Sequence, residues 1–126
     1  MFEIFIPIAP VAKQRARVCK THAYTPKETV YFAKAIGLIV KAEMRKRKMQ
    51  ILHNALDVDF DFFIVKPKTV KRIFHTTTPD KDNLEKAMMD ALNGILWKDD
   101  KQIVSGRTTK QYGEAGIRMR VTDLET

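Results

Sequence analysis

Alternating apolar and polar side chains predict the β-strands of this chain. Residues 2–6 alternate in this way, and residues 56–64 do so over a longer stretch. Residues 117–122 alternate too, with two arginines on the outward face. A further strand is expected over residues 102–111, forming a hairpin with 117–122 around residues 112–116. The predicted core positions of the two longer patterns are Leu56, Val58, Phe60, Phe62, Ile64, Ile117, Met119 and Val121.

Helical periodicity is strongest from residue 27 to about residue 48. One predicted buried stripe consists of Tyr31, Ala35, Leu38, Ile39 and Ala42, and a second apolar edge of Phe32, Ile36 and Val40. So wide an apolar face can enter the chain's own core entirely, or part of it can form a two-fold dimer interface. The preceding residues, 13–26, have the composition of an irregular basic loop.

A second, shorter helix is predicted between residues 82 and 93. Its apolar stripe consists of Leu84, Ala87, Met88, Ala91 and Leu92. Asp82 and Glu85 have the spacing of a capping box, and Asn93-Gly94 supplies a left-handed stop. Asp82, Lys86 and Asp90 then line up on an adjacent polar stripe.

These elements together predict one α/β (α+β) domain over residues 1–126, with a mixed sheet and two main helices. A chain of 126 residues with 44% hydrophobic residues can bury one sizeable core. No apolar run reaches membrane-spanning length, so we expect a cytoplasmic protein without a membrane contact. The single cysteine, Cys19, cannot form an internal disulfide, and no spacing suggests zinc or an organic cofactor.

The net charge of +8 favours an acidic partner, and the basic residues are clustered. Basic groups around a small acidic centre are what a protein that cuts a phosphodiester strand needs. Residues 66–78 are expected to form a strand end and a mobile, DNA-facing segment, in which Phe74 and His75 have no assigned role. The predicted DNA contacts are Lys13, Arg15, Arg17, Lys71, Arg72 and Lys110.

Acidic residues gather around the start of the second helix. Asp80 precedes it and Asp82 begins it, while Asp99-Asp100 follows shortly after its end. Mg²⁺ is held by one or two carboxylates together with waters and substrate phosphate oxygens, which these aspartates can supply. Alternatively, they form a turn, a helix cap and a polar connection. Asp57, Asp59 and Asp61 offer a further ligand, or else a solvated face paired with basic residues.

The order and spacing of these residues resemble the RusA-type Holliday junction resolvase family. The resemblance rests on Asp80-Lys81-Asp82-Asn83, Lys86, Asp90-Ala91-Leu92-Asn93-Gly94 and Trp97-Lys98-Asp99-Asp100-Lys101-Gln102, with weaker support from residues 7–17. It implies that Asp80, Asp82 and Asp100 bind the metal and that Lys86 is the catalytic lysine. Ala16 departs from the proline common in the family, which affects only the predicted DNA contacts.

This resemblance implies a RusA-like fold and a magnesium-dependent endodeoxyribonuclease, with Mn²⁺ as a substitute metal. It also implies a homodimer that resolves four-way junctions by paired symmetric nicks in DNA recombination and repair. Two alternatives stay open. Pro79-Asp80 with Asp99-Asp100-Lys101 meets the loose PD…(D/E)-x-K pattern of other nucleases, and a non-catalytic basic DNA-binding module would need the aspartates only for structure.

Overall fold

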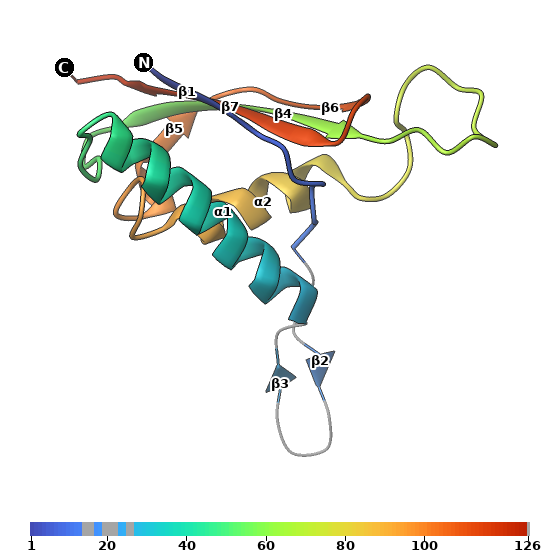
Figure 1. Ribbon diagram of the computed structural model, residues 1–126, viewed down its shortest axis with the longest axis horizontal. Coiled ribbons are helices and arrows are strands. Elements are labelled where there is room, and N and C mark those ends of the chain that lie inside the picture. Colours follow the sequence, from blue (N-terminus) through green and yellow to red (C-terminus); the bar gives the residue numbers. More distant parts are fainter. Residues whose placement is uncertain (14–16, 19–22, 25–26, 126) are drawn as a thin grey trace.

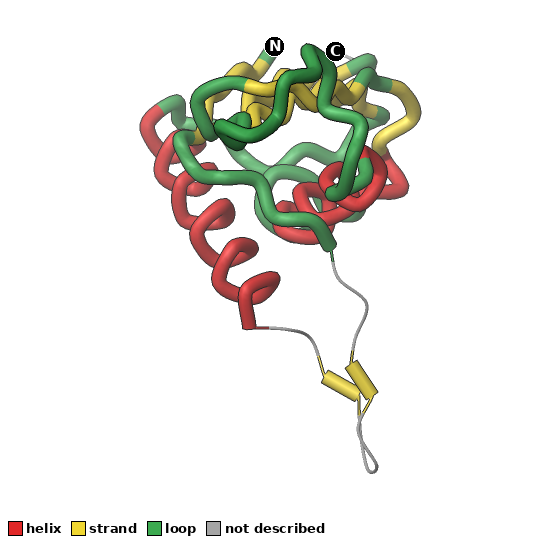
Figure 2. Tube along the Cα trace, turned by 90° about the vertical axis from the view of Figure 1, so that its right-hand side faces the viewer, coloured by secondary structure: helices red, strands yellow, loops and turns green. Residues whose placement is uncertain are grey.

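The computed structural model describes residues 1–13, 17–18, 23–24 and 27–125. A mixed five-stranded sheet is covered on one face by two helices (Figures 1 and 2). The predictions for Arg15 and Cys19 lie outside the described residues. The strands of the sheet are β1 (Phe2–Ile6), β4 (Leu56–Ile64), β5 (Ile103–Ser105), β6 (Thr108–Tyr112) and β7 (Gly116–Asp123). The fold class predicted from the sequence, α+β with a mixed sheet and two main helices, is therefore confirmed.

Strand β4 is the centre of the sheet. On one side it pairs antiparallel with β7, which in turn pairs antiparallel with β1. On the other side β5 and β6 both run parallel to it, β5 beside its start and β6 beside its end. The alternation predicted for residues 56–64 matches this position, because Leu56, Val58, Phe60 and Phe62 are buried and the intervening residues are partly exposed.

The predicted hairpin between residues 102–111 and 117–122 is wrong. Residues 100–102 form a short 3-10 helix, η1 (Asp100–Gln102), and the strand that follows is broken at Gly106. At Gly106 the φ angle is +149°, and a Cβ atom there would lie 1.8 Å from the carbonyl oxygen of Val58. After this break the chain continues as β6, which pairs with β4 on the same side as β5. Strands β6 and β7 therefore flank β4 on opposite sides and do not form a hairpin.

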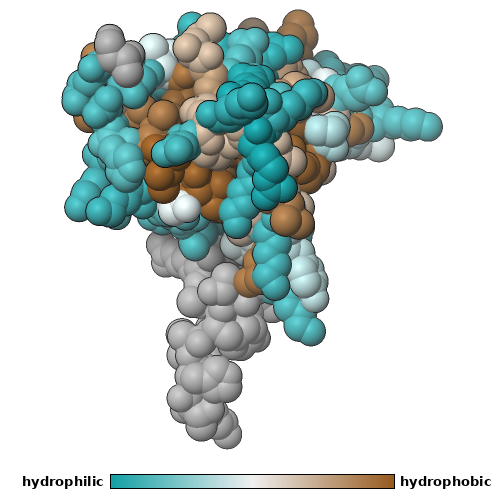
Figure 3. Space-filling view, turned by 60° about the vertical axis from the view of Figure 1, so that its left-hand side comes forward, coloured by the Kyte–Doolittle hydropathy of each residue, from teal (hydrophilic) through white to brown (hydrophobic). Residues whose placement is uncertain are grey.

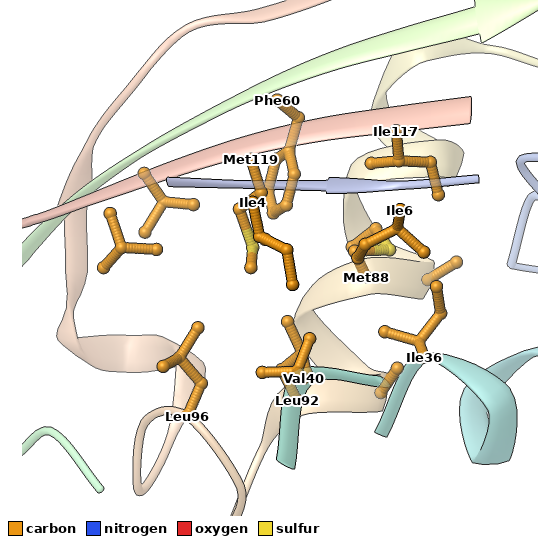
Figure 4. Packing of buried hydrophobic residues seen from close by; sticks show 14 of the residues in the cluster. Ile4, Ile6, Ile36, Val40, Phe60, Met88, Leu92, Leu96, Ile117 and Met119 are labelled. Atoms are coloured by element: carbon orange, nitrogen blue, oxygen red, sulfur yellow. The ribbon is translucent and has the colours of Figure 1, made fainter. Parts of the chain in front are cut away.

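Helices α1 (Lys27–Lys46) and α2 (Lys81–Leu92) lie against each other and against the same face of the sheet (Figure 1). Figure 4 shows side chains from β1, β7, α1 and α2 meeting in this layer. The fully buried members include Ile6, Ile36, Val40, Met88, Leu92, Leu96 and Ile117. Residues 13–26, expected to be irregular, include a two-stranded ribbon formed by β2 (Arg17–Val18) and β3 (Ala23–Tyr24).

The orientation of α1 differs from the prediction. Phe32, Ile36 and Val40, predicted as a secondary edge, are the buried residues, whereas Tyr31 is 64% exposed and Leu38 is 70% exposed. The buried face also carries Gly37, where an added Cβ would lie 2.9 Å from the Cδ1 atom of Ile95. Apolar side chains consequently remain on the outside, and Figure 3 shows such surface among hydrophilic residues on the face in view.

Helix α2 buries the predicted stripe of Leu84, Ala87, Met88, Ala91 and Leu92. Its N-cap, however, is Asp80 rather than Asp82, so the predicted capping box is wrong. The helix begins earlier because Asp80 already accepts the backbone N–H of Leu84, and the Glu85 carboxylate bonds the hydroxyl of Thr108 instead of reaching back. Gly94, with φ of +79°, confirms the predicted left-handed stop. None of the described helices is long and apolar enough to cross a membrane.

Candidate active site

Two carboxylates stand at the N-terminus of α2. Asp80 is the N-cap and Asp82 lies in the first turn, and both residues are exposed. Asp80 makes no side-chain cap hydrogen bond, and within the described residues neither carboxylate has a hydrogen bond or ion pair. A helix N-terminus stabilises negative charge, but two exposed acids at one helix end exceed what capping needs. Both carboxylates are thus available to a cation or a ligand.

Strand β6 holds the segment that leads into this helix end. The Lys110 ammonium donates to the carbonyl oxygens of Thr77 at 2.6 Å and Pro79 at 3.0 Å. One turn into α2, the hydroxyl of Thr108 donates to the carboxylate of Glu85. Two side chains of one strand therefore fix both the approach to Asp80 and the first turn after it. Sequence spacing predicted Lys110 as a phosphate contact and carried no signal for this positioning role.

The polar stripe of α2 contains one unpaired cation. Lys86 is exposed and makes no ion pair with Asp82 or Asp90 among the described side chains. Asp90 instead binds the Lys13 ammonium at 3.0 Å, and the Lys13 backbone N–H donates to the carbonyl oxygen of Asn83 at 2.9 Å. Lys13, a predicted DNA contact, is therefore held against α2 by its ammonium group and its backbone N–H. This contact leaves Lys86 free to meet a ligand near Asp82.

Asp100 lies far from the other two predicted metal ligands. Gln102, in the same 3-10 turn, donates to the carbonyl oxygens of Leu52 and Asn54, and Ile103 pairs with Leu56 at the start of β4. Lys110, which contacts Pro79, pairs instead with Phe62 near the end of β4. The strand between Leu56 and Phe62 spans roughly 20 Å at the usual rise per residue.

One chain therefore does not bring the predicted trio together. In the described part of the chain, no group of three or more His, Cys, Asp or Glu side chains is placed to hold a metal ion. Asp80 and Asp82 lie together at the N-terminus of α2. Asp100 comes after the loop that follows the C-terminus of this helix.

Asp99 has a structural role. Its carboxylate accepts the backbone N–H of Lys101 at 3.0 Å, and its own N–H donates to the Gln102 side chain at 2.9 Å, which completes a capping box for η1. The hydrogen bond from Lys101 holds the pKa of Asp99 below its ordinary value. A carboxylate committed in this way is a weak candidate for a ligand, whereas Asp100 is the first residue of the turn that Asp99 caps.

The acids of β4 form the predicted charge-paired face. Asp59 and Asp61 lie 3.6 Å and 3.4 Å from the Arg120 guanidinium, and Asp57 accepts a hydrogen bond from Ser105 at 2.6 Å. Asp59 also accepts the backbone N–H of Arg107 at 2.8 Å. These contacts explain the three acids without a metal.

The remaining predicted DNA contacts are spread over the chain. Lys71 and Arg72 are exposed on the segment between β4 and α2, which has neither helix nor strand between residues 65 and 80. The Nε atom of Arg72 donates to the hydroxyl of Tyr112 at 3.2 Å. Arg17 belongs to β2, and its side chain lies outside the described part of the structure.

Next to Lys110, the imidazole of His75 is buried, with 8% of the residue exposed. Its ring lies 5.0 Å from the Tyr112 ring, and its Nδ1 has no hydrogen-bond partner in the described structure. Burial, aided by the charges of Lys110 and Arg72, lowers the pKa of His75 below its ordinary value of 6.5. The ring is therefore neutral at physiological pH. Sequence reasoning left this residue without a role, because a single histidine has no distinguishing pattern.

The net charge of +8, with exposed carboxylates at a helix end and lysines near them, is a feature of proteins that act on a nucleic-acid backbone. Comparison with known families is more specific, since the family model described as Endodeoxyribonuclease RusA matches residues 7–122. The chain belongs to the RusA endodeoxyribonuclease family, as its aspartate pattern predicted. This membership indicates a nuclease, with junction DNA as the substrate class.

Among curated proteins, the chain is similar to the uncharacterized protein YqaN of Bacillus subtilis (strain 168). The two are 30% identical over 121 residues, and the match covers 83% of each chain. That relative brings no described activity, so the residue roles must come from the geometry of this chain.

Proposed function

We propose that this protein is a magnesium-dependent resolvase of four-way DNA junctions that works as a homodimer, in recombination and repair. The observation that carries the proposal is the pair of exposed carboxylates, Asp80 and Asp82, which have no partner among the described residues and stand at the N-terminus of α2 in a chain of the RusA family. A binding module would have no need to leave two neighbouring acids unpaired on the surface that meets phosphates, since their charge repels DNA.

The donor set fits a hard divalent cation. Carboxylate oxygens suit Mg²⁺ and Mn²⁺, and Mg²⁺ takes the rest of its shell from waters and substrate phosphate oxygens. Asp80 and Asp82 would hold the ion. When bound, it supplies activation of a water molecule and neutralisation of the charge that builds on the cleaved phosphate.

The chain's own cations have two separate tasks in this proposal. Lys86, which lies one turn after Asp82 and has no ion pair in the described part of the chain, approaches the phosphate and stabilises its developing charge. Lys110 is a positioning residue, because its two hydrogen bonds hold the backbone that ends at Asp80.

Homodimerisation would account for Asp100. Because Asp100 lies at the opposite end of β4 from Asp80, the predicted trio can form only if a second copy supplies one part of it. The exposed apolar stripe of α1, which includes Tyr31 and Leu38, provides a surface for such a copy. A four-way junction is nearly two-fold symmetric, so two equivalent centres would nick opposed strands at matching positions.

The position of Asp99 disfavours the alternative PD…(D/E)-x-K nuclease. That pattern would use Asp80, Asp99 and Lys101 together, yet α2 separates the first from the other two. Asp99 is moreover committed to capping the backbone N–H of Lys101.

Cleavage of a synthetic four-way junction, compared with linear duplex of the same sequence, tests the proposal. We expect paired symmetric nicks in the junction that require Mg²⁺ and are lost in Asp82→Asn. Glu28→Gln is the matched control, because Glu28 is also an exposed acid in the first turn of a helix. Tight junction binding without cleavage under Mg²⁺ or Mn²⁺ would make the protein a DNA-binding module instead.

A further inference from the structure

A pocket lies beside the acidic helix end, between the segment before α2 and strand β6. Its volume is about 550 Å³, within the range of small-molecule sites, and its walls include Ile73, Phe74, His75, Lys81, Lys110 and Tyr112. Residues 65–80, which supply Ile73, Phe74 and His75 to its lining, form the loop that extends past the end of β4 in Figure 1. None of the roles proposed above for Asp80, Asp82 and Lys86 requires it.

The apolar wall of the pocket is unusually exposed. Ile73 is 80% exposed and Phe74 is 77% exposed, in a segment otherwise rich in lysine, arginine and threonine. Tyr112 forms the opposite wall, where its ring meets the imidazole of His75. Large exposed side chains side by side indicate a surface that becomes covered when a partner binds.

The charge of the pocket indicates what that partner is. Both charged residues in its lining are lysines, and no carboxylate lines it. Lys81 lies between Asp80 and Asp82 in the sequence, and Lys110 is bonded to the carbonyl oxygen of Pro79. A molecule in the pocket would therefore have the exposed Lys81 side chain for a phosphate at its edge, and the proposed metal ligands immediately beyond.

His75 provides an independent observation. Its Nδ1 atom is buried without a hydrogen-bond partner in the described chain, and a buried polar group without a partner has a cost that normally needs an explanation. The imidazole therefore lines the pocket and has a ring nitrogen without a hydrogen-bond partner among the described residues.

We propose that this pocket binds a single unstacked nucleobase of the DNA strand that is cut, next to the cleaved phosphate. The inference rests on the proposed function and deepens it, because it names the part of the substrate that this chain recognises beyond the backbone. Aromatic rings stack on a base of any sequence, and the exposed Lys81 at the edge of the pocket can contact a phosphate. A protein partner is a poorer fit, because the pocket adjoins the surface beside the acidic centre, where the proposed function places the DNA backbone.

The test combines base removal with side-chain removal. Junctions are prepared with one abasic nucleotide at each of the two positions on either side of the cleaved phosphate. Their affinities are measured without divalent metal for the native chain, for Phe74→Ala and for Leu124→Ala, a control that also removes an exposed apolar side chain. Phe74 is largely exposed, so its replacement leaves the core intact.

We expect one position at which the ratio of abasic to intact dissociation constants is at least about five-fold higher for the native chain than for Phe74→Ala. Taking this ratio cancels the cost of unstacking the base, which both proteins share. Leu124→Ala should give the native ratio. At the same position, 5-iodouracil should crosslink under ultraviolet light to a peptide containing Phe74 or Tyr112.

Equal ratios at all four positions, with crosslinks absent from both peptides, would overturn the pocket assignment while leaving the nuclease proposal intact if the native chain still cuts the unmodified junction. Failure to bind the unmodified junction in preference to duplex would overturn both. A ratio change without the crosslink would place the base elsewhere and would also refute the assignment.

Discussion

The Lys110 ammonium on β6 and the carbonyl oxygen of Pro79 are 3.0 Å apart, although 31 positions separate the two residues in the sequence. With its second bond, to Thr77, Lys110 ties the end of an irregular segment to the sheet immediately before Asp80. The position of the Asp80 carboxylate thus depends on a strand that follows it in the chain.

Lys110→Met should therefore lower the rate of junction cleavage about ten-fold or more, while junction affinity without metal changes less than about three-fold. Hydrogen bonds from a charged donor are worth about 1.5–3 kcal/mol, enough to loosen the loop. Cleavage rates and binding at several salt concentrations provide the measurement. Lys41→Met is the control, because Lys41 is an exposed lysine of α1 that is not among the predicted DNA contacts.

A different result would restore the original prediction for Lys110. If the variant lost affinity uniformly and its salt dependence decreased by about one phosphate contact, Lys110 would be a DNA contact rather than a positioning residue.

The features that sequence predicted correctly are local or periodic. The alternation around Phe60 predicts a half-buried strand, whichever strands lie beside it. The stripe through Leu84 and Met88 likewise predicts a helix with one buried face. The aspartate pattern around Asp80 identified the family, because a family can be recognised from the order and spacing of residues in the sequence. The distances between these residues in space are not needed for that.

The features that sequence missed depend on contacts between distant segments. The residues near Gly106 in the sequence do not indicate that the carbonyl oxygen of Val58 lies where a side chain at position 106 would be. Glu85 has the spacing of a capping residue, yet Thr108 competes for its carboxylate. In α1, two apolar faces were available, and the pattern did not indicate which of them packs against the sheet. The metal trio stays a prediction, and within one chain Asp100 lies near the opposite end of β4 from Asp80.

Lys86→Met should separate chemistry from stability. Because Lys86 has no ion pair within the described residues, its replacement should change the free energy of unfolding by less than about 0.5 kcal/mol. Junction cleavage should fall about 100-fold, since one cation near the developing charge contributes on that scale. Urea unfolding and single-turnover cleavage measure the two effects.

Lys34→Met, an exposed lysine on α1, serves as the control for Lys86 and should leave both quantities unchanged. A stability loss of more than about 1 kcal/mol in Lys86→Met would instead indicate a structural ion pair of the kind expected for neighbouring helix residues.

Mixing two inactive variants tests whether the proposed metal centre is shared between protomers. If Asp100 acts with Asp80 and Asp82 of the other copy, a heterodimer of Asp82→Asn and Asp100→Asn has one intact centre and one doubly altered centre. After subunit exchange, about a quarter of the native number of centres should return in an equal mixture of two-fold dimers. Cruciform plasmid should then be nicked but not linearised.

A mixture of Asp82→Asn with Asp80→Asn is the matched control and should stay inactive, because those two residues share one centre. If the first mixture is also inactive although affinity tags show that heterodimers form, the three aspartates do not act across the dimer.

The last prediction concerns His75, whose pKa in the folded protein is lowered by burial and by the charge of Lys110. The unfolded chain then binds a proton more readily than the folded chain, so His75 lowers stability as the pH falls below its ordinary pKa of 6.5. Thermal unfolding at pH 7.5 and pH 5.5 should show a larger loss of stability on acidification for the native chain than for His75→Gln. His53→Gln is the matched variant, because it makes the same substitution at an exposed histidine. Identical pH dependence in the native and His75→Gln proteins would mean that His75 takes up a proton equally well in the folded state.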